Sequence, residues 1–437
     1  MENQLEVNTI QTNKNRDIFF LLSLFFLSIL LHQSTIVFGV NLSFADFFCF
    51  FILLFLIGTH QLVVPIYPLI FFLLVSIHVI VTAAFYIPNK FMLIPDSFGI
   101  TSDYVKLIAI FLYLIIGYNL AKINLLHQTL RWYSLFGLFI GALGVLLTVI
   151  NKRIFSEIFF FGDTRYRGLM IDPNYFSVLQ VTALVYISRM KNLMPRYHFL
   201  AWIVIFSSII VSGSKTGLIT FICYSLLRII EWLFLSNKKI NHLVMYLVIA
   251  VLSFITMPVI FHFIRPLIND LMLSIPSISR IQPLFTDFTH AISGNGSGRE
   301  ETWNAASQVI HLSPFSGTGI GTYTHLAWEL FQYDNVAHNT FLQLAAEWGI
   351  PLAFCLFFYI FLLLGNAAMS RSVNMETRVL RDIIFVLLIG SMAVSLNNAR
   401  MLWLFLGALM FFLKETSNKQ AVFPFLNKNK KDIRRGK

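Results

Sequence analysis

Five residues in this sequence carry side chains suited to phosphate binding and proton transfer: Arg165, Arg167, Lys215, Arg299 and His338. Arginine guanidinium groups bind phosphate oxygens through paired hydrogen bonds, whereas a lysine ammonium supplies a point charge. An imidazole can accept a proton near neutral pH. Gathered in one pocket, these side chains could bind a phosphorylated ligand and activate a hydroxyl group beside it.

Three of these residues also have structural explanations that depend on their neighbours in the chain. Lys215 lies between apolar runs, where its long side chain could simply reach the membrane surface. Arg167 has Asp163 and Asp172 nearby and could form an ion pair within a loop. Arg165 has a weaker functional case than Arg167.

Arg299 and His338 also have possible structural roles. Arg299 is followed by Glu300 and Glu301, and it would share a helical face with Trp303, so it could be paired locally. His338 is one of eleven histidines, and an isolated histidine more often lies at the surface or caps a helix. Residue type and spacing alone therefore leave both roles undecided.

The composition indicates the kind of fold that must position these side chains. The chain has 437 residues, of which 57% are hydrophobic and only 12% are charged. An ordinary soluble domain has about 25% charged residues, so this chain cannot cover a water-facing surface of its size. Its three cysteines fall within apolar runs, which favours neither a disulfide framework nor a metal site. The composition predicts an all-α polytopic membrane protein.

Apolar runs long enough to cross a bilayer divide the chain into about 12 transmembrane helices. The predicted spans are Ile18–Val37, Leu42–Gly58, Leu62–Phe85, Tyr104–Leu120, Trp132–Ile150, Pro173–Ser188, Phe199–Val211, Thr216–Leu235, Leu243–Phe261, Ile350–Ala367, Ile383–Leu396 and Met401–Leu413. Most Lys and Arg residues lie in the termini and alternate loops, which predicts that both termini are cytoplasmic. The net charge of +11 is therefore an orientation signal, and no nucleic-acid partner is expected.

The long segment between the ninth and tenth spans, 262–339, contains local structural signals. Ser297 and Glu300 form a capping box, which predicts a helix as far as about His311. The run Gly317-Thr318-Gly319-Ile320-Gly321 is better explained as a turn between helices than as a phosphate-binding loop, because no strand precedes it. A further helix is expected to begin at His338-Asn339 and to break near Pro351, before the tenth span.

Several short motifs occur in a fixed order on one predicted membrane face. They are Arg165-Tyr166-Arg167-Gly168 leading to Asp172-Pro173-Asn174, Ser212-Gly213-Ser214-Lys215, Gly298-Arg299-Glu300-Glu301-Thr302-Trp303, Pro314-Phe315-Ser316-Gly317-Thr318-Gly319, His338-Asn339-Thr340-Phe341-Leu342-Gln343 and Glu347-Trp348-Gly349-Ile350. In combination they resemble the signature of the O-antigen ligase and polymerase superfamily of bacterial envelope glycosyltransferases. The family often has Arg where Lys215 stands, and Lys keeps the charge but loses the paired hydrogen bonds.

The resemblance implies a substrate and a reaction. A glycan attached to undecaprenyl diphosphate would be transferred to a sugar hydroxyl, without a nucleotide-sugar, a metal or another cofactor. His338 would be the catalytic residue, and Arg165, Arg167, Lys215 and Arg299 would bind the diphosphate or the glycan. The enzyme would lie in the bacterial inner membrane, and a chain-length regulator and a flippase of the same pathway are expected partners besides the lipid bilayer.

The resemblance also implies a domain organisation with a large periplasmic loop between helices 9 and 10. The predicted segments are a cytoplasmic tail (1–17), transmembrane helices 1–9 (18–261), a periplasmic loop subdomain (262–339), transmembrane helices 10–12 (340–413) and a basic cytoplasmic tail (414–437). A polymerase of lipid-linked repeat units is favoured, an O-antigen ligase acting on lipid A–core is the alternative, and a transporter or flippase ranks third. Asp46 is the clearest charge within a span.

Overall fold

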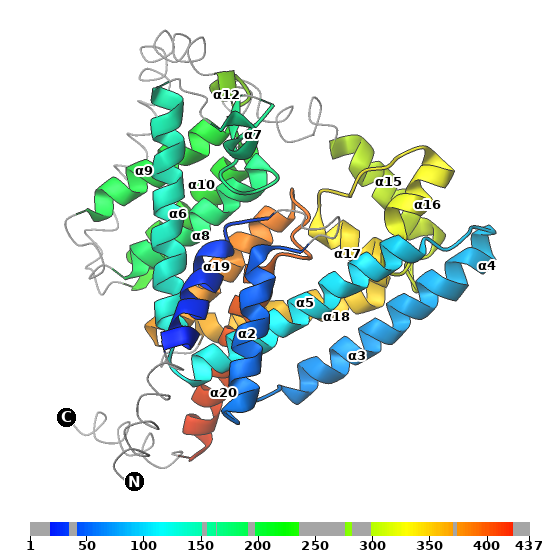
Figure 1. The fold of residues 1–437 in the computed structure, drawn as a ribbon, viewed down its shortest axis with the longest axis horizontal. Coiled ribbons are helices and arrows are strands. Elements are labelled where there is room, and N and C mark those ends of the chain that lie inside the picture. The colour runs from blue at the N-terminus through cyan, green and yellow to red at the C-terminus, as the bar shows by residue number, and fades with distance from the viewer. Residues whose placement is uncertain are drawn as a thin grey trace, which may run out of the picture. The chain divides into compact units, whose positions relative to one another are not determined.

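A computed structural model describes residues 18–34, 42–150, 155–162, 164–190, 197–235, 276–281, 299–369 and 374–422. Over these ranges the regular elements are helices, apart from one antiparallel sheet of two short strands (Figure 1). The chain divides into two compact units, one formed by residues 1–134 and 298–437 and the other by residues 135–297.

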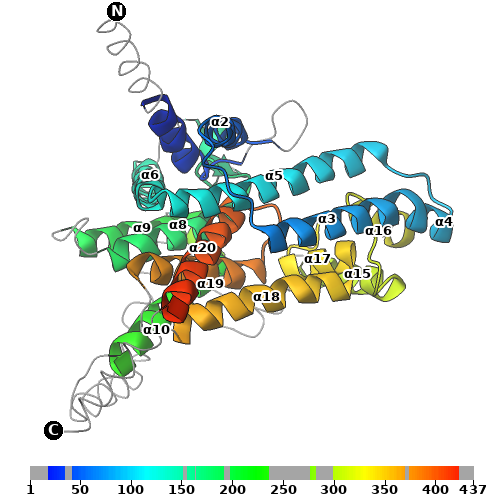
Figure 2. The ribbon, with the colours of Figure 1, turned by 90° about the horizontal axis from the view of Figure 1, so that it is seen from below.

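The first unit contains most of the long helices. They are the helix Ile18–Leu30, α2 (Phe44–Gly58), α3 (Ile66–Val81) continuing through η1 (Thr82–Tyr86) and α4 (Ile87–Phe91), α5 (Ser97–Lys122), α15 (Arg299–Leu312), α16 (Tyr323–Phe331), α17 (Thr340–Trp348), α18 (Ile350–Met369), α19 (Met375–Ser391) and α20 (Arg400–Val422). Within this unit α3, α5 and α18 run alongside one another in both views (Figures 1 and 2).

The second unit is built around α8 (Pro173–Arg189), which packs against both α9 (His198–Ser212) and α10 (Lys215–Leu235). It also contains α7 (Ser156–Phe159), β1 (Phe160–Phe161), β2 (Arg165–Tyr166) and α12 (Pro276–Ser279), and α6 (Leu126–Val149) contributes residues to both units. The segment predicted as a loop subdomain, 262–339, contributes α12 to this unit and α15 and α16 to the first one.

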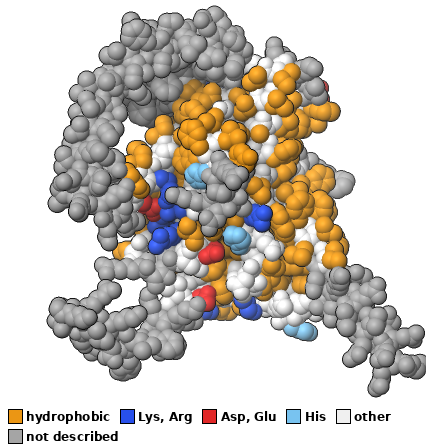
Figure 3. Space-filling model, turned by 90° about the vertical axis from the view of Figure 1, so that its left-hand side faces the viewer, with side chains coloured by type: hydrophobic (Ala, Val, Ile, Leu, Met, Phe, Trp, Pro, Cys, Tyr) orange, Lys and Arg blue, Asp and Glu red, His pale blue; other side chains and the backbone are white. Residues whose placement is uncertain are grey.

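Four helical stretches are long and apolar enough to cross a membrane: Ile66–Phe91, Ser97–Lys122, Leu126–Val149 and Ile350–Met369. In the view of Figure 3, hydrophobic side chains cover much of the described surface, and the charged side chains gather mainly in its central and lower part. Each predicted span overlaps a described helix except Leu243–Phe261, which lies outside the described residues. The prediction of a helical multi-pass membrane protein is therefore confirmed, whereas the count of twelve spans stays a prediction.

Two glycines allow the backbones of α5 and α20 to approach closely. A side chain added at Gly117 would collide with the backbone of Leu404, and one added at Gly407 would collide with the backbone of Leu114. Small residues have this role between membrane helices, because burial of apolar surface provides little drive for association in lipid and close packing provides more. Among the described helix pairs, α5 and α20 pack against each other most extensively.

The helices predicted in the segment before the tenth span are present in the structure. The helix predicted to run to about His311 is α15, which ends at Leu312, whereas Ser297 of the predicted capping box lies outside the described residues. The expected break lies at Gly349, between the end of α17 and the start of α18, where φ is 80° and ψ is 158°. Pro351 is the second residue of α18, a position where its missing N–H leaves no hydrogen bond unmade.

The glycine-rich run is a turn that packs tightly against neighbouring backbone. Gly317, Gly319 and Gly321 all have positive φ values of 67–80°. A side chain at Gly317 would meet the carbonyl oxygen of Glu347, and a side chain at Gly321 would meet the backbone of Gly99. The glycines are thus explained by close approach of backbone to backbone, as expected for a turn between helices.

Candidate functional site

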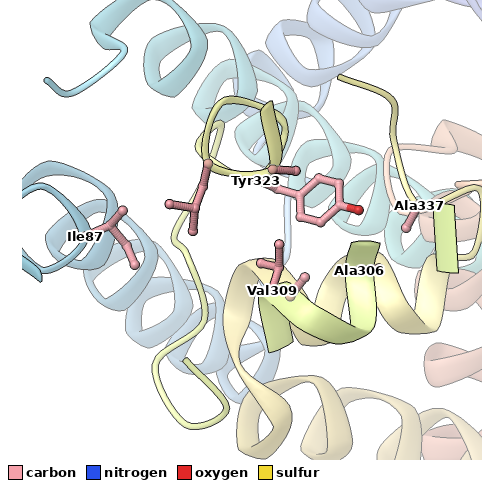
Figure 4. Packing of buried hydrophobic residues seen from close by; sticks show 8 residues of the cluster. Ile87, Ala306, Val309, Tyr323 and Ala337 are labelled. Atoms are coloured by element: carbon pink, nitrogen blue, oxygen red, sulfur yellow. The ribbon is translucent and has the colours of Figure 1, made fainter. Parts of the chain in front are cut away.

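One hydrophobic cluster joins the helix that begins at Arg299 to the turn that carries His338. Ala306 and Val309 of α15, Tyr323 of α16 and Ala337 all belong to it and are buried (Figure 4). Helix α15 packs against both α16 and α17. Two of the five predicted site residues therefore depend on the same packed core.

The turn at His338 is held on both sides by hydrogen bonds. Before it, the buried N–H of Ala337 donates to Oε1 of Gln343 at 2.9 Å. After it, Oδ1 of Asn339 accepts from the N–H groups of Phe341 and Leu342, at 3.0 and 3.2 Å, and so caps α17. His338 itself has a φ of 47°, an unfavourable conformation for a residue other than glycine, and its side chain is partly exposed. Such a backbone persists only when its surroundings fix it.

Helix α17 is anchored at both ends to other parts of the first unit. Near its start, the hydroxyl of Thr340 donates to Val394 O at 2.9 Å and accepts from Leu396 N at 2.8 Å. Near its end, Gly319 N donates to the carbonyl oxygen of Glu347 at 2.9 Å. The anchors restrict both rotation and sliding of α17, and with it the position of His338.

Arg299 is the first residue of α15, and its side chain is partly exposed. Its carbonyl oxygen accepts a hydrogen bond from the hydroxyl of Thr302 at 2.7 Å. The opposite end of the helix is fixed by Lys90, whose ammonium group donates to Leu312 O at 2.6 Å. A basic residue in the first helical turn opposes the helix dipole, so helix stability does not explain the choice of Arg299.

In the second unit, Arg165 connects three segments that the sequence motifs had singled out. Its side chain is buried, with only 6% of the residue exposed. Its guanidinium donates to Ser212 O at 3.0 Å, to Gly213 O at 3.4 Å and to Oδ1 of Asn174 at 3.3 Å. Arg165 therefore stabilises the turn between α9 and α10 through hydrogen bonds to its carbonyl oxygens.

Lys215 begins α10 immediately after that turn, and its side chain is partly exposed. The hydroxyl of Ser214 accepts from Gly217 N at 3.0 Å, which caps the helix, and donates to Oδ1 of Asn174 at 2.9 Å. Since Asn174 also accepts from Arg165, the two motif segments predicted to act together do meet in this unit.

Arg167 uses its guanidinium group to bind backbone. It donates to the carbonyl oxygens of Glu157, Ile158 and Ile171, the last two at 3.3 Å. Within the described part of the chain it forms no ion pair with Asp172, and Asp163 lies outside that part. The observed role of Arg167 is to hold the loop between α7 and α8 together.

The five predicted site residues thus form two groups. Arg165, Arg167 and Lys215 belong to the second unit, and Arg299 and His338 belong to the first. That all five share one pocket stays a prediction.

Gln343 and Glu347 belong to the sequence motifs but were given no functional role from the sequence. Both side chains are buried in α17, the helix that follows the His338 turn. The amide Nε2 of Gln343 donates to Oε1 of Glu347. Burial raises the pKa of Glu347 to about 8, and the nearby charge of Asp103 acts in the same direction. The only signal in the sequence is their spacing of four residues, which places them on one face of a helix.

Asp46, the charge that a transporter would need to keep accessible, is part of a closed ion pair in the first unit. Arg400 donates to both carboxylate oxygens at 2.7 Å, and the hydroxyl of Tyr113 donates to one of them at 3.0 Å. The N–H of Ser43 donates to the other oxygen at 2.8 Å. With its oxygens occupied in this way, Asp46 joins α2, α5 and α20 and has a structural role.

In the ranges that the structure covers, no three His, Cys, Asp or Glu side chains lie close enough to share a metal ion. Cys49, Cys223 and Cys355 are free thiols.

Residues 199–357 match a family model described as O-antigen ligase. The matched segment contains Lys215, Arg299 and His338, and it begins after Arg165 and Arg167. Among proteins of curated function, none matches the chain. The family match lends independent support to the resemblance drawn from the motifs.

Proposed function

We propose that this chain, a helical membrane protein of the O-antigen ligase and polymerase superfamily, polymerises oligosaccharide repeat units carried on undecaprenyl diphosphate. The reaction would take place at the periplasmic face of the bacterial inner membrane. The observation that supports the proposal is the common core of α15 and the His338 turn, because it packs together the elements that carry Arg299 and His338 within the matched segment.

In the proposed reaction, the hydroxyl oxygen of the acceptor sugar attacks the anomeric carbon of the donor glycan. A new carbon–oxygen bond forms while the bond from that carbon to the phosphate oxygen breaks, and the phosphate leaves with the electron pair. His338 accepts the proton of the attacking hydroxyl. The products are the lengthened glycan and undecaprenyl diphosphate.

The leaving diphosphate gains negative charge as the bond breaks, so positive groups beside it lower the barrier. Arg299 and Lys215 are the best candidates, because each is partly exposed at the start of a helix. Arg167 would have to give up carbonyl partners to bind phosphate. Arg165 is buried and would act by supporting the turn before Lys215.

Ligation is the second candidate function, because the matching family model is described as O-antigen ligase. A ligase would use the same donor but transfer the finished glycan to lipid A–core. The Arg-Tyr-Arg-Gly and Asp-Pro-Asn motifs and the long segment 262–339 favour polymerisation. The pairing of Asp46 with Arg400 supports neither an ion-coupled transporter nor a flippase.

Deletion of the gene, followed by gel analysis of the surface glycan, tests the proposal. Loss of a polymerase leaves single repeat units on the core, whereas loss of a ligase leaves the core bare. Complementation with His338→Ala or Arg299→Ala is expected to give normal membrane insertion but no long chains. The matched control is His325→Ala, a partly exposed histidine of α16, which should restore them. Long chains restored by His338→Ala would remove His338 from the catalytic role.

A further inference from the structure

We propose that Gln343 and Glu347 are positioning residues for His338 and act through the peptide N–H of Ala337. The inference rests on the proposed function, in which His338 takes the proton of the acceptor hydroxyl. Neither residue needs to touch the substrate. Their contribution is to fix the backbone from which the imidazole projects.

The contacts form one continuous path from α17 to the His338 turn. Ala337 N donates to Oε1 of Gln343 at 2.9 Å, and Nε2 of Gln343 donates to Oε1 of Glu347. Because the amide oxygen of Gln343 is used by a backbone N–H, its amino group must face Glu347 and needs an acceptor there. Ala337 is fully buried, and only 4% of Gln343 and 7% of Glu347 is exposed, so water cannot readily replace these partners.

The path ends in a part of the molecule that is held firmly. The carbonyl oxygens of Ala346 and Glu347 accept from Thr318 N and Gly319 N, at 2.7 and 2.9 Å. The glycine-rich turn that supplies these donors has no space for a side chain against α17 at Gly317. Glu347 therefore offers Gln343 an acceptor at a fixed position, and Gln343, held in this way, offers an acceptor to the N–H of Ala337.

His338 needs such support more than an ordinary turn residue does. Its left-handed backbone, with φ of 47°, is stable only while its neighbours hold it. Without Gln343, the buried N–H of Ala337 would lack an acceptor, and the turn would move to find one. A shift of the imidazole by about 1 Å is enough to slow a proton transfer by up to roughly a hundredfold.

A carboxyl group at position 347 is also costly, which argues that more than helix packing maintains it. The side chain lines a small pocket whose other polar members are Asp103, Asn397 and Asn398. Burial, together with the nearby charge of Asp103, raises the pKa of the carboxyl group to about 8. An apolar side chain at this buried position would avoid the cost of burying a polar group, but it could not accept from Gln343.

The experiment uses the full chain in lipid vesicles and measures the chemical reactivity of His338 separately from substrate turnover. Diethyl pyrocarbonate modification of His338, followed by mass spectrometry over a range of pH, reports the exposure and the pKa of the imidazole. Turnover of a lipid-linked oligosaccharide is measured in parallel, as kcat and KM. The variants are Gln343→Leu, Glu347→Ala and the conservative Glu347→Gln, whose amide oxygen can still accept. The control is Asn119→Leu, which removes another buried amide that accepts a backbone N–H, that of Val63 at 2.8 Å.

Gln343→Leu and Glu347→Ala are expected to change the modification rate of His338 about fivefold, the equivalent of one ordinary hydrogen bond. Both should lower kcat by about tenfold or more with little change in KM, and both should shift the limb of the pH profile that reports His338. Glu347→Gln should restore most of both properties. If Gln343→Leu leaves the reactivity of His338 and the pH profile unchanged, or if Asn119→Leu alters them equally, the inference is wrong. Altered His338 reactivity in a protein that shows no turnover of the lipid-linked donor would instead contradict the proposed function alone.

Discussion

Replacement of Glu347 by Gln should change how the stability of the protein depends on pH. Burial, reinforced by the charge of Asp103, raises the pKa of this carboxyl group from 4.5 to about 8 in the folded protein. The amide of Gln343 and the ammonium group of Lys106 act in the opposite direction but do not offset it. Tyr323, whose own pKa is raised by burial and by the charges of Tyr333 and Glu347, also lies near this group.

The sign follows from the protons bound in each state. Between pH of about 4.5 and about 8, the folded protein retains a proton on Glu347 that the unfolded chain has released. The free energy of unfolding must therefore fall as the pH rises through this window, by roughly 1.4 kcal/mol per pH unit. From pH 5.5 to 7.5 the loss amounts to roughly 3 kcal/mol. Above the folded pKa the carboxyl is ionised in both states, and the slope disappears.

Glu347→Gln removes the titrating group and keeps an oxygen that can accept from Gln343. Unfolding of wild type and variant in detergent is followed by tryptophan fluorescence at several pH values. The difference between their free energies of unfolding isolates Glu347, because the contributions of the other titrating groups are the same in both proteins. This difference should move by roughly 3 kcal/mol in favour of the variant between pH 5.5 and 7.5. Glu329→Gln, an exposed carboxyl of α16, should show no such trend. A difference between wild type and Glu347→Gln that stays constant over the range would refute the buried, protonated carboxyl.

Three further predictions concern packing and chemistry. Asp46→Asn leaves the largely buried guanidinium of Arg400 without its anion and should lower the free energy of unfolding by about 3 kcal/mol. Thermal unfolding would measure this loss, with Arg400→Leu as the second arm of a double-mutant cycle. Gly407→Ala should cost about 1–3 kcal/mol because it forces α20 away from α5. Gly365→Ala, with open space around a position inside α18, should raise the free energy of unfolding slightly in the same assay, because alanine favours a helix more than glycine does. Chelating agents should leave turnover in reconstituted vesicles unchanged, and a loss of activity reversed by added divalent ion would contradict the predicted metal-independent reaction.

The helices of this protein could be predicted because their causes are local. Helix α15 ends shortly before Pro314, and the break between α17 and α18 is encoded by Gly349 and Pro351. These residues are adjacent to where they act. Apolar runs likewise identify the spanning helices without knowledge of their neighbours. The count of spans, the periplasmic position of the long loop and the orientation of the termini stay predictions.

The contacts that define the candidate site could not be predicted in the same way. Asp46 and Arg400 are 354 positions apart, and nothing near either residue identifies the other as its partner. Arg165 could be recognised as a basic residue in a motif, but its burial beneath the turn after α9 depends on how β2 packs on that helix. Such pairings depend on where distant backbone segments meet, which periodicity does not encode.

The placement of the basic residues itself argues for an anionic ligand. Lys215 and Arg299 are the first residues of α10 and α15, where the helix dipole makes a positive side chain unfavourable and an acidic one favourable. Each placement costs about 0.3–1 kcal/mol in the absence of an anion. A positive side chain at the start of a helix and the helix dipole itself both act favourably on a phosphate group. If Lys215 and Arg299 bind the diphosphate of the donor, Lys215→Glu or Arg299→Glu should therefore abolish turnover of the lipid-linked oligosaccharide, because each puts a negative charge beside the phosphate oxygens.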